Sequence, residues 1–74
     1  MVIYELIRKD ETLAIFSRSF ILTHYYLMTT DVSIREIALI ETVVEDLCIK
    51  QMDFEEYSKY WINDYKLKIK RKDD

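Results

Sequence analysis

The chain has 74 residues, of which 14 are acidic and 11 are basic, and its formal net charge at pH 7 is −3. It contains no glycine and no proline, which excludes glycine-rich phosphate loops, dinucleotide-binding fingerprints and nucleophile elbows, because each needs glycine where the backbone takes a positive φ or closely approaches a ligand. One cysteine, Cys48, and one histidine, His24, form neither an internal disulfide nor a metal site of the usual nitrogen and sulfur kind. We therefore expect one non-enzymatic domain over residues 1–74, with no catalytic residues, no metal and no cofactor.

The apolar runs are short and interrupted by charge, and no signal-peptide pattern is present at the N-terminus. A lone thiol suits a reducing compartment. These features predict a cytoplasmic protein without a membrane partner.

Residues 1–16 are predicted to form a β-hairpin. Two runs rich in β-branched and aromatic residues, Val2–Ile7 and Thr12–Phe16, flank the charged stretch Arg8–Glu11. Because glycine, which two-residue turns usually need, is absent, we expect a four-residue loop built on a type I turn. A helix is the alternative, since several of the same apolar residues also fit helical spacing.

Residues 17–30 are predicted to form a first helical segment. Ser17 and Ser19 are candidate N-caps, and the apolar residues of Phe20–Met28 occupy most sides of a helix, which indicates a buried element. The β-branched content of this segment leaves a third strand as the alternative.

Residues 33–50 carry the clearest helix signal. Ser33 and Glu36 form a capping box, in which each side chain satisfies a backbone amide near the other. The expected core stripe consists of Ile37, Ile40, Val44 and Leu47, supported by Ile34 and Cys48.

A last helix with a basic tail is predicted over residues 53–70, with Asp53 as its cap and Glu56 three residues further on. Its aromatic stripe, expected to be core, consists of Phe54, Tyr57, Trp61 and Tyr65. Tyr60 lies off this stripe and is the candidate for an exposed anchor residue, because tyrosine is frequent in interface hot spots. Alternation of lysine with apolar residues in the tail leaves a short strand as the alternative.

These elements predict an α+β fold class, with the N-terminal hairpin packed on about three helices, and an all-α helical bundle is the alternative. His24, Cys48 and Trp61 are expected in or near the core, together with the apolar stripe of residues 33–50.

Charge is segregated along the chain. Residues 31–64 carry nine acidic and three basic side chains, whereas residues 66–72 carry five basic side chains and no acidic one. Carboxylates at helical spacing can imitate a row of phosphates and so attract a basic surface. The residues expected to contact a partner are Glu41, Glu45, Asp46, Glu55, Glu56 and Tyr60. A solvated face is the plainer interpretation, and a Mg²⁺ site or acid–base pair at Glu41 and Glu45 is a further alternative.

The opening stretch Val2–Phe16 resembles the beginning of many short accessory proteins of temperate bacteriophages, which often start with such a hairpin followed by helices. The resemblance covers about the first fifth of the chain. It implies a small regulator or inhibitor, such as an antirepressor or anti-defence protein, that occupies a binding surface on another protein. The remainder departs from the commonest members, which continue with a glycine-containing helix-turn-helix.

We therefore expect a protein-binding inhibitor of transcription regulation that acts as a DNA mimic, with a DNA-binding regulator or defence protein as its partner. A nucleic-acid-binding module is the first alternative, although the acidic net charge makes direct binding less favoured. Its site would be the basic tail, Lys66, Lys68, Lys70, Arg71 and Lys72, with Arg8, Lys9 and Arg18 as possible additions. A module that completes its core by forming a homo-dimer is the second alternative.

Overall fold

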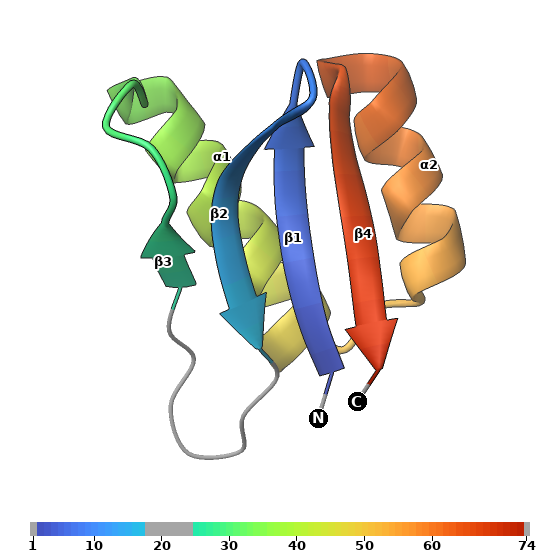
Figure 1. Cartoon of the computed structure of the whole chain (residues 1–74). Coiled ribbons are helices and arrows are strands. Elements are labelled where there is room, and N and C mark those ends of the chain that lie inside the picture. Colours follow the sequence, from blue (N-terminus) through green and yellow to red (C-terminus); the bar gives the residue numbers. More distant parts are fainter. Residues whose placement is uncertain (1, 18–24, 74) are drawn as a thin grey trace.

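The computed structural model describes residues 2–17 and 25–73, which form a four-stranded antiparallel sheet with two helices on one of its faces (Figure 1). The strands are β1 (Val2–Arg8), β2 (Glu11–Ser17), β3 (Tyr25–Leu27) and β4 (Leu67–Asp73). The helices are α1 (Ile34–Val44), which continues into the π-helical segment η1 (Glu45–Ile49), and α2 (Phe54–Tyr65). The strand order β3-β2-β1-β4 makes the first and the last strand neighbours.

The predicted arrangement of a hairpin packed on about three helices is wrong, and so is the all-α alternative, because the α+β structure has a four-stranded antiparallel sheet and two helices. The described residues form two helices, whereas three were expected. The sheet has four strands, because β3 and β4 extend the predicted two-stranded hairpin. The described end of segment 17–30 forms β3, while residues 18–24, with Ser19, His24 and most of the expected helix, lie outside the described residues. None of the described helices has the length and the apolar character required to cross a membrane.

The predicted N-terminal hairpin is present as β1 and β2, but its turn is tighter than predicted. Arg8 pairs with Glu11, so the loop consists of Lys9 and Asp10 alone. Their φ angles of 48° and 64° are left-handed, as in the type I′ turn that matches the twist of a hairpin. The expected four-residue loop is wrong because two residues other than glycine accept this conformation.

A bulge in β2 brings two consecutive residues into the core. The pairing shifts from Leu6–Ala14 to Ile7–Thr12, which leaves Leu13 as the extra residue of β2. Leu13 and Ala14 are both fully buried, an outcome that regular strand alternation would not allow.

The core lies between the sheet and the two helices. The sheet contributes Tyr4, Leu6, Leu13, Ala14, Phe16, Leu67 and Ile69, and the helices contribute Ile40, Val43, Val44, Leu47, Cys48, Tyr57 and Trp61. Burial of Ile40, Val44, Leu47, Cys48 and Trp61 confirms that part of the predicted core. Ile37 is half-buried, whereas Ile34, the first residue of α1, is 87% exposed and does not belong to the core as predicted.

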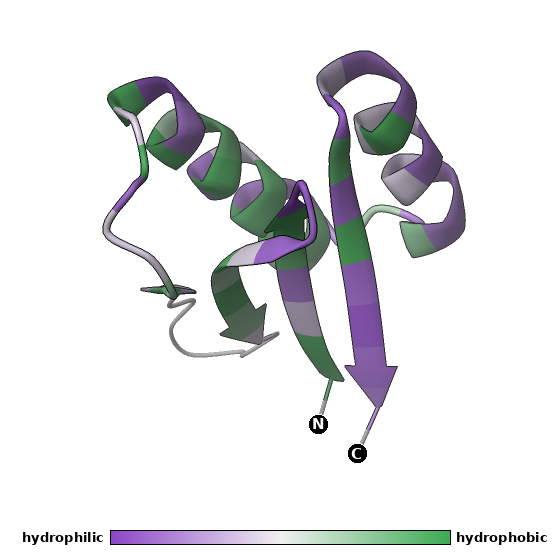
Figure 2. Ribbon diagram, turned by 45° about the horizontal axis from the view of Figure 1, so that its top comes forward, coloured by the Kyte–Doolittle hydropathy of each residue, from purple (hydrophilic) through white to green (hydrophobic). Residues whose placement is uncertain are grey.

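The helix predicted over residues 53–70 ends at Tyr65, and its expected continuation as a charged helical end is wrong. Lys66 adopts a left-handed conformation with φ 59°, and its N–H donates to the carbonyl group of Trp61. This αL cap reverses the chain, and β4 then runs alongside β1. Figure 2 shows that polar residues dominate the C-terminal part of β4.

Candidate functional site

A groove of about 400 Å³ lies where η1 and the following loop meet the first two turns of α2. It is lined by Asp46, Met52, Asp53, Glu56, Tyr57 and Tyr60, which we call the acidic groove. Three of the six residues predicted to contact a partner, Asp46, Glu56 and Tyr60, are among them. The structure thus brings together residues from two helices that sequence reasoning selected separately.

The loop between the helices is held by backbone hydrogen bonds. Gln51 takes a left-handed φ of 54°, and the N–H of Met52 donates to the carbonyl group of Asp46 at 3.0 Å. The carboxylate of Asp53 then accepts the backbone N–H of Glu56 at 3.2 Å, which confirms Asp53 as the cap of α2. These bonds fix one wall of the acidic groove relative to the other.

The floor of the groove contains a hydrogen bond between two helices. The hydroxyl group of Tyr57 donates to Oδ2 of Asp46 at 2.5 Å, and Nζ of Lys50 lies 3.5 Å from Oδ1 of the same carboxylate. Burial raises the pKa of Tyr57, and the bond to Asp46 raises it further. Tyr57 therefore stays protonated as a donor at neutral pH, and the Asp46 carboxylate is occupied by its neighbours.

The outer rim of the groove offers groups for a ligand. Glu56 is exposed, and its carboxylate makes no hydrogen bond or ion pair with the residues that the structure describes. Met52 is 45% exposed and Tyr60 is 49% exposed. The ring of Tyr60 stands edge-on to Trp61 and Tyr65, with centroid distances of 6.0 and 5.7 Å, which limits its motion. A cation with an apolar stem is the kind of group that suits a rim formed by a carboxylate and exposed Met and Tyr side chains.

The other three predicted contact residues lie outside the groove. Glu41 accepts a hydrogen bond from the hydroxyl group of Tyr25 at 3.0 Å and so joins α1 to β3. Burial raises the pKa of Tyr25, and Glu41 adds to the rise. Glu45 is exposed at the start of η1, and Glu55 lines a separate hollow beside Arg71. Within the described chain, no group of three or more His, Cys, Asp or Glu side chains is arranged to hold a metal ion.

The residues of the predicted basic tail belong to β4 and its preceding cap, and they point in different directions. Lys68, Lys70 and Lys72 are exposed and alternate with buried Leu67 and Ile69, so the three lysines form a row on the face of the sheet opposite the helices. Lys72 lies 3.5 Å from the Glu5 carboxylate of β1. Arg71 points to the other face and pairs with Asp73 at 3.0 Å, while Lys66 caps α2.

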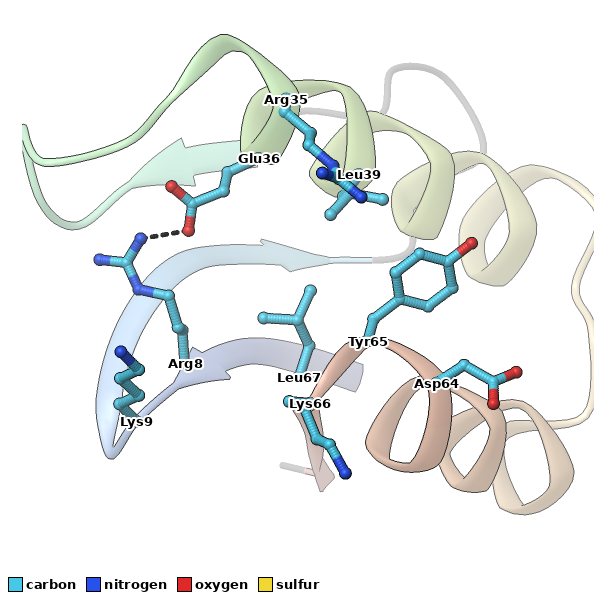
Figure 3. Close-up of a pocket in the computed structure, with 9 residues that line it drawn as sticks. All are labelled: Arg8, Lys9, Arg35, Glu36, Leu39, Asp64, Tyr65, Lys66 and Leu67. Carbon is cyan, nitrogen blue, oxygen red and sulfur yellow. Dashed lines mark hydrogen bonds and ion pairs between the residues drawn. The ribbon is translucent and has the colours of Figure 1, made fainter.

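A second hollow, of about 350 Å³, lies at the opposite end of the helical layer (Figure 3). Its walls come from the hairpin, from the first turns of α1 and from the junction of α2 with β4, and we call it the hairpin cleft. The guanidinium of Arg8 forms an ion pair with Glu36, and its Nη2 donates to the carbonyl group of Asp31 at 3.2 Å. The Ser33 amide and Arg8 hold the pKa of Glu36 below its ordinary value. Arg18, which was predicted together with Arg8 and Lys9 as a possible addition to the nucleic-acid-binding site of the basic tail, lies outside the described residues.

Sequence reasoning did not assign Met52, Asp53 and Tyr57 to the site. Asp53 was recognisable as a cap and Tyr57 as a core residue, but neither role indicates a groove. The available signal was the hydrophobic staple, in which the residue before a helix cap packs against the fourth helical residue. Met52 and Tyr57 occupy those two positions around Asp53, and both line the acidic groove.

Comparison with known proteins finds no match for this chain among family models, curated proteins or solved structures.

Proposed function

We propose that this protein is a small protein-binding regulator that docks a basic segment of another protein in the acidic groove. The observation that carries the proposal is the position of the free Glu56 carboxylate beside the exposed side chains of Met52 and Tyr60. The docked segment belongs to a surface that the partner otherwise uses to bind nucleic acid.

Arginine is the side chain that fits this rim best. Its planar guanidinium can form two hydrogen bonds with the Glu56 carboxylate and stack on the ring of Tyr60, while its aliphatic stem covers Met52. Proteins that bind nucleic acid use arginine and lysine to contact phosphates. Occupation of the groove by such arginines would therefore compete directly with nucleic acid.

The charge of the helical layer favours the same encounter. Residues 34–65 carry eight acidic and three basic side chains, while the lysine row of β4 lies on the opposite face of the sheet. A basic surface is therefore attracted to the helical face and repelled by the β4 face. Such a field raises the association rate and orients the partner before contact.

A titration with designed peptides tests the chemistry of the groove. A fluorescent peptide in which arginine alternates with leucine is expected to bind, with the largest NMR shifts at Met52, Glu56 and Tyr60. A control peptide with glutamate in place of arginine is expected not to bind, and one with serine in place of leucine to bind more weakly. Shifts confined to Glu41 and Glu45, or equal binding of all three peptides, would contradict the proposal.

A second function is favoured by the lysine row of β4. Lys68, Lys70 and Lys72 project from one face beside Ile3 and Ile7 of β1, an arrangement that could lie along a nucleic-acid backbone. Fluorescence polarisation with labelled single-stranded and duplex oligonucleotides tests it. Binding that weakens steeply with salt and is lost in the triple lysine-to-glutamine variant would support it, and no binding at low salt would remove it.

A further inference from the structure

We propose that β3 pairs with β3 of a second copy of this chain, so that two sheets join edge to edge about a two-fold axis at Tyr26. β3 and β4 form the two edges of the sheet (Figure 1). An unpaired edge strand is a template for another strand unless charged side chains oppose the pairing. The acidic groove lies between η1 and α2, so this dimer is independent of the proposed function.

The outer side of β3 presents backbone groups to a partner strand. The N–H of Met28 donates to the carbonyl group of Leu13 in β2 at 2.8 Å. Because backbone groups alternate in direction along a strand, those of Tyr25 and Leu27 point away from β2. No strand of the described ranges lies on that side. A second β3 in antiparallel orientation places its Leu27 opposite Tyr25, and the two residues can exchange both N–H···O=C bonds.

The two edges of the sheet differ in charge. The hollow beside β3, of about 720 Å³, is lined only by uncharged residues: Leu27, Met28, Thr29, Thr30, Val32 and Ile37. The hollow beside β4 is lined in part by charged residues: Glu55, Lys70, Arg71 and Asp73. Lysines on an edge strand oppose pairing with another chain, and β4 carries them whereas β3 does not. We therefore assign strand addition to the β3 edge.

A second copy is the partner that suits an uncharged edge. The chain has a net charge of −3, so two copies repel each other over their charged surfaces. Residues 25–30 contain no charged side chain, so two copies can approach there without this repulsion. An acidic or basic peptide would find no opposite charge in the same residues. A chain of 74 residues without an internal disulfide also gains stability from a partner subunit.

Tyr26 lies at the centre of β3 and projects from the face of the sheet opposite the helices. Its neighbours Tyr25 and Leu27 pair with Phe16 and Ala14, which are both core residues, and side chains alternate between the two faces of a strand. In the two-fold arrangement Tyr26 lies directly opposite Tyr26 of the second copy. Aromatic pairs at such cross-strand positions stabilise a sheet.

Exposed apolar side chains extend the contact surface beyond the three residues of β3. Tyr26 is 68% exposed and Met28 is 53% exposed. Ile37 lines the hollow beside β3, and Ile34, one helical turn earlier on α1, is 87% exposed. Contiguous apolar surface of this kind marks an interaction site. The edge-to-edge dimer brings this surface beside the second copy.

Sedimentation velocity of the full chain over a series of concentrations tests the proposal. The unaltered chain is expected to form a species of twice its mass of 9.0 kDa that dissociates on dilution. Tyr26→Lys and Tyr26→Glu should each raise the dissociation constant at least about tenfold, because the two-fold axis places like charges opposite each other. An equimolar mixture of the two variants should form the dimer again, because lysine then lies opposite glutamate. Tyr26 is exposed, so both substitutions leave the core unchanged.

Ile62→Lys is the matched control, because it places the same lysine on another exposed apolar residue, in α2 and away from β3. Its dissociation constant should equal that of the unaltered chain. The proposal would be overturned by a monomer at millimolar protein concentration, by equal loss of the dimer in Ile62→Lys and Tyr26→Lys, or by a mixture of the two Tyr26 variants that stays monomeric.

Discussion

The hydroxyl group of Tyr57 donates a hydrogen bond to the carboxylate of Asp46 over 2.5 Å, and this bond ties α2 to η1. It lies in the floor of the acidic groove, so the same contact stabilises the helical layer and sets the shape of the candidate site.

Replacement of Tyr57 tests the structural part of this contact. Tyr57→Phe is expected to lower the free energy of unfolding by about 1–2 kcal/mol, because the half-buried Asp46 carboxylate loses a donor. Urea denaturation measures the change. Tyr60→Phe removes the hydroxyl group of a half-exposed tyrosine in the same helix and should change stability by less than about 0.5 kcal/mol. Equal effects of the two substitutions would show that the bond to Asp46 contributes nothing.

Acid is expected to destabilise the protein partly through Glu36. The Ser33 amide, and to a smaller extent Arg8, lowers the pKa of Glu36 from its ordinary value of 4.5 in the folded state. The unfolded chain therefore binds the proton more readily, so the contribution of Glu36 to stability is complete above pH 4.5 and is lost as the pH falls through the folded pKa. Thermal unfolding between neutral and acidic pH should show a smaller loss in Glu36→Gln than in the unaltered chain. An identical loss in both would contradict this role.

Glycine at the end of α2 is expected to stabilise the protein. Lys66 has a φ of 59°, and Lys66→Gly should raise the free energy of unfolding by about 0.5–1 kcal/mol, because relief of the left-handed strain exceeds the entropy that glycine loses on folding. Lys68→Gly, two residues later in the extended β4, should instead lower it by a similar amount. If Lys66→Gly also lowers the free energy of unfolding, the left-handed conformation of Lys66 at the end of α2 would be contradicted.

Helix starts were predictable because their signals are local. Ser33 and Glu36 satisfy each other's backbone amides as the capping box requires, and Asp53 caps α2 as expected. The end of α2 was not predictable in the same way, because the usual marker of a left-handed cap is glycine and Lys66 occupies that position. Glycine is also absent from the two-residue turn at Lys9 and Asp10, so this turn could not be predicted from the usual sequence marker.

The strand β4 shows how tertiary pairing overrides local preference. Leu67 and Ile69 alternate with lysines, and this period was visible, but a lysine-rich end following a helical pattern is also typical of a helix terminus. The structure pairs Ile69 with Leu6 and Leu67 with Arg8, so burial against β1 decides between the two. Only the three-dimensional arrangement supplies that partner.

Half of the residues that line the acidic groove were predictable from the sequence, but their assembly was not. Asp46 and Glu56 were selected for their charge and Tyr60 for its exposure, and all three line the groove. Their proximity depends on the loop between η1 and α2, in which Gln51 takes a left-handed φ of 54°. Glu41 was also selected from the sequence for its charge, yet its carboxylate contacts Tyr25 of β3 and lies outside the groove. A charge pattern therefore identifies an acidic surface, and the turn between the helices identifies the site within it.

The central claim is that the groove itself, and not general acidity, binds a protein partner. Glu56 and Glu55 are adjacent in the first turn of α2, and Glu56 lines the groove whereas Glu55 does not. The most direct test is affinity capture from cell lysate, with and without nuclease treatment, by the immobilised chain, by Glu56→Lys and by Glu55→Lys, which carry the same change in charge. We predict that one DNA-binding or defence protein is retained by the unaltered chain and by Glu55→Lys and is lost with Glu56→Lys. Retention of that protein by all three forms, its loss with both variants alike, or its disappearance after nuclease treatment would contradict the claim.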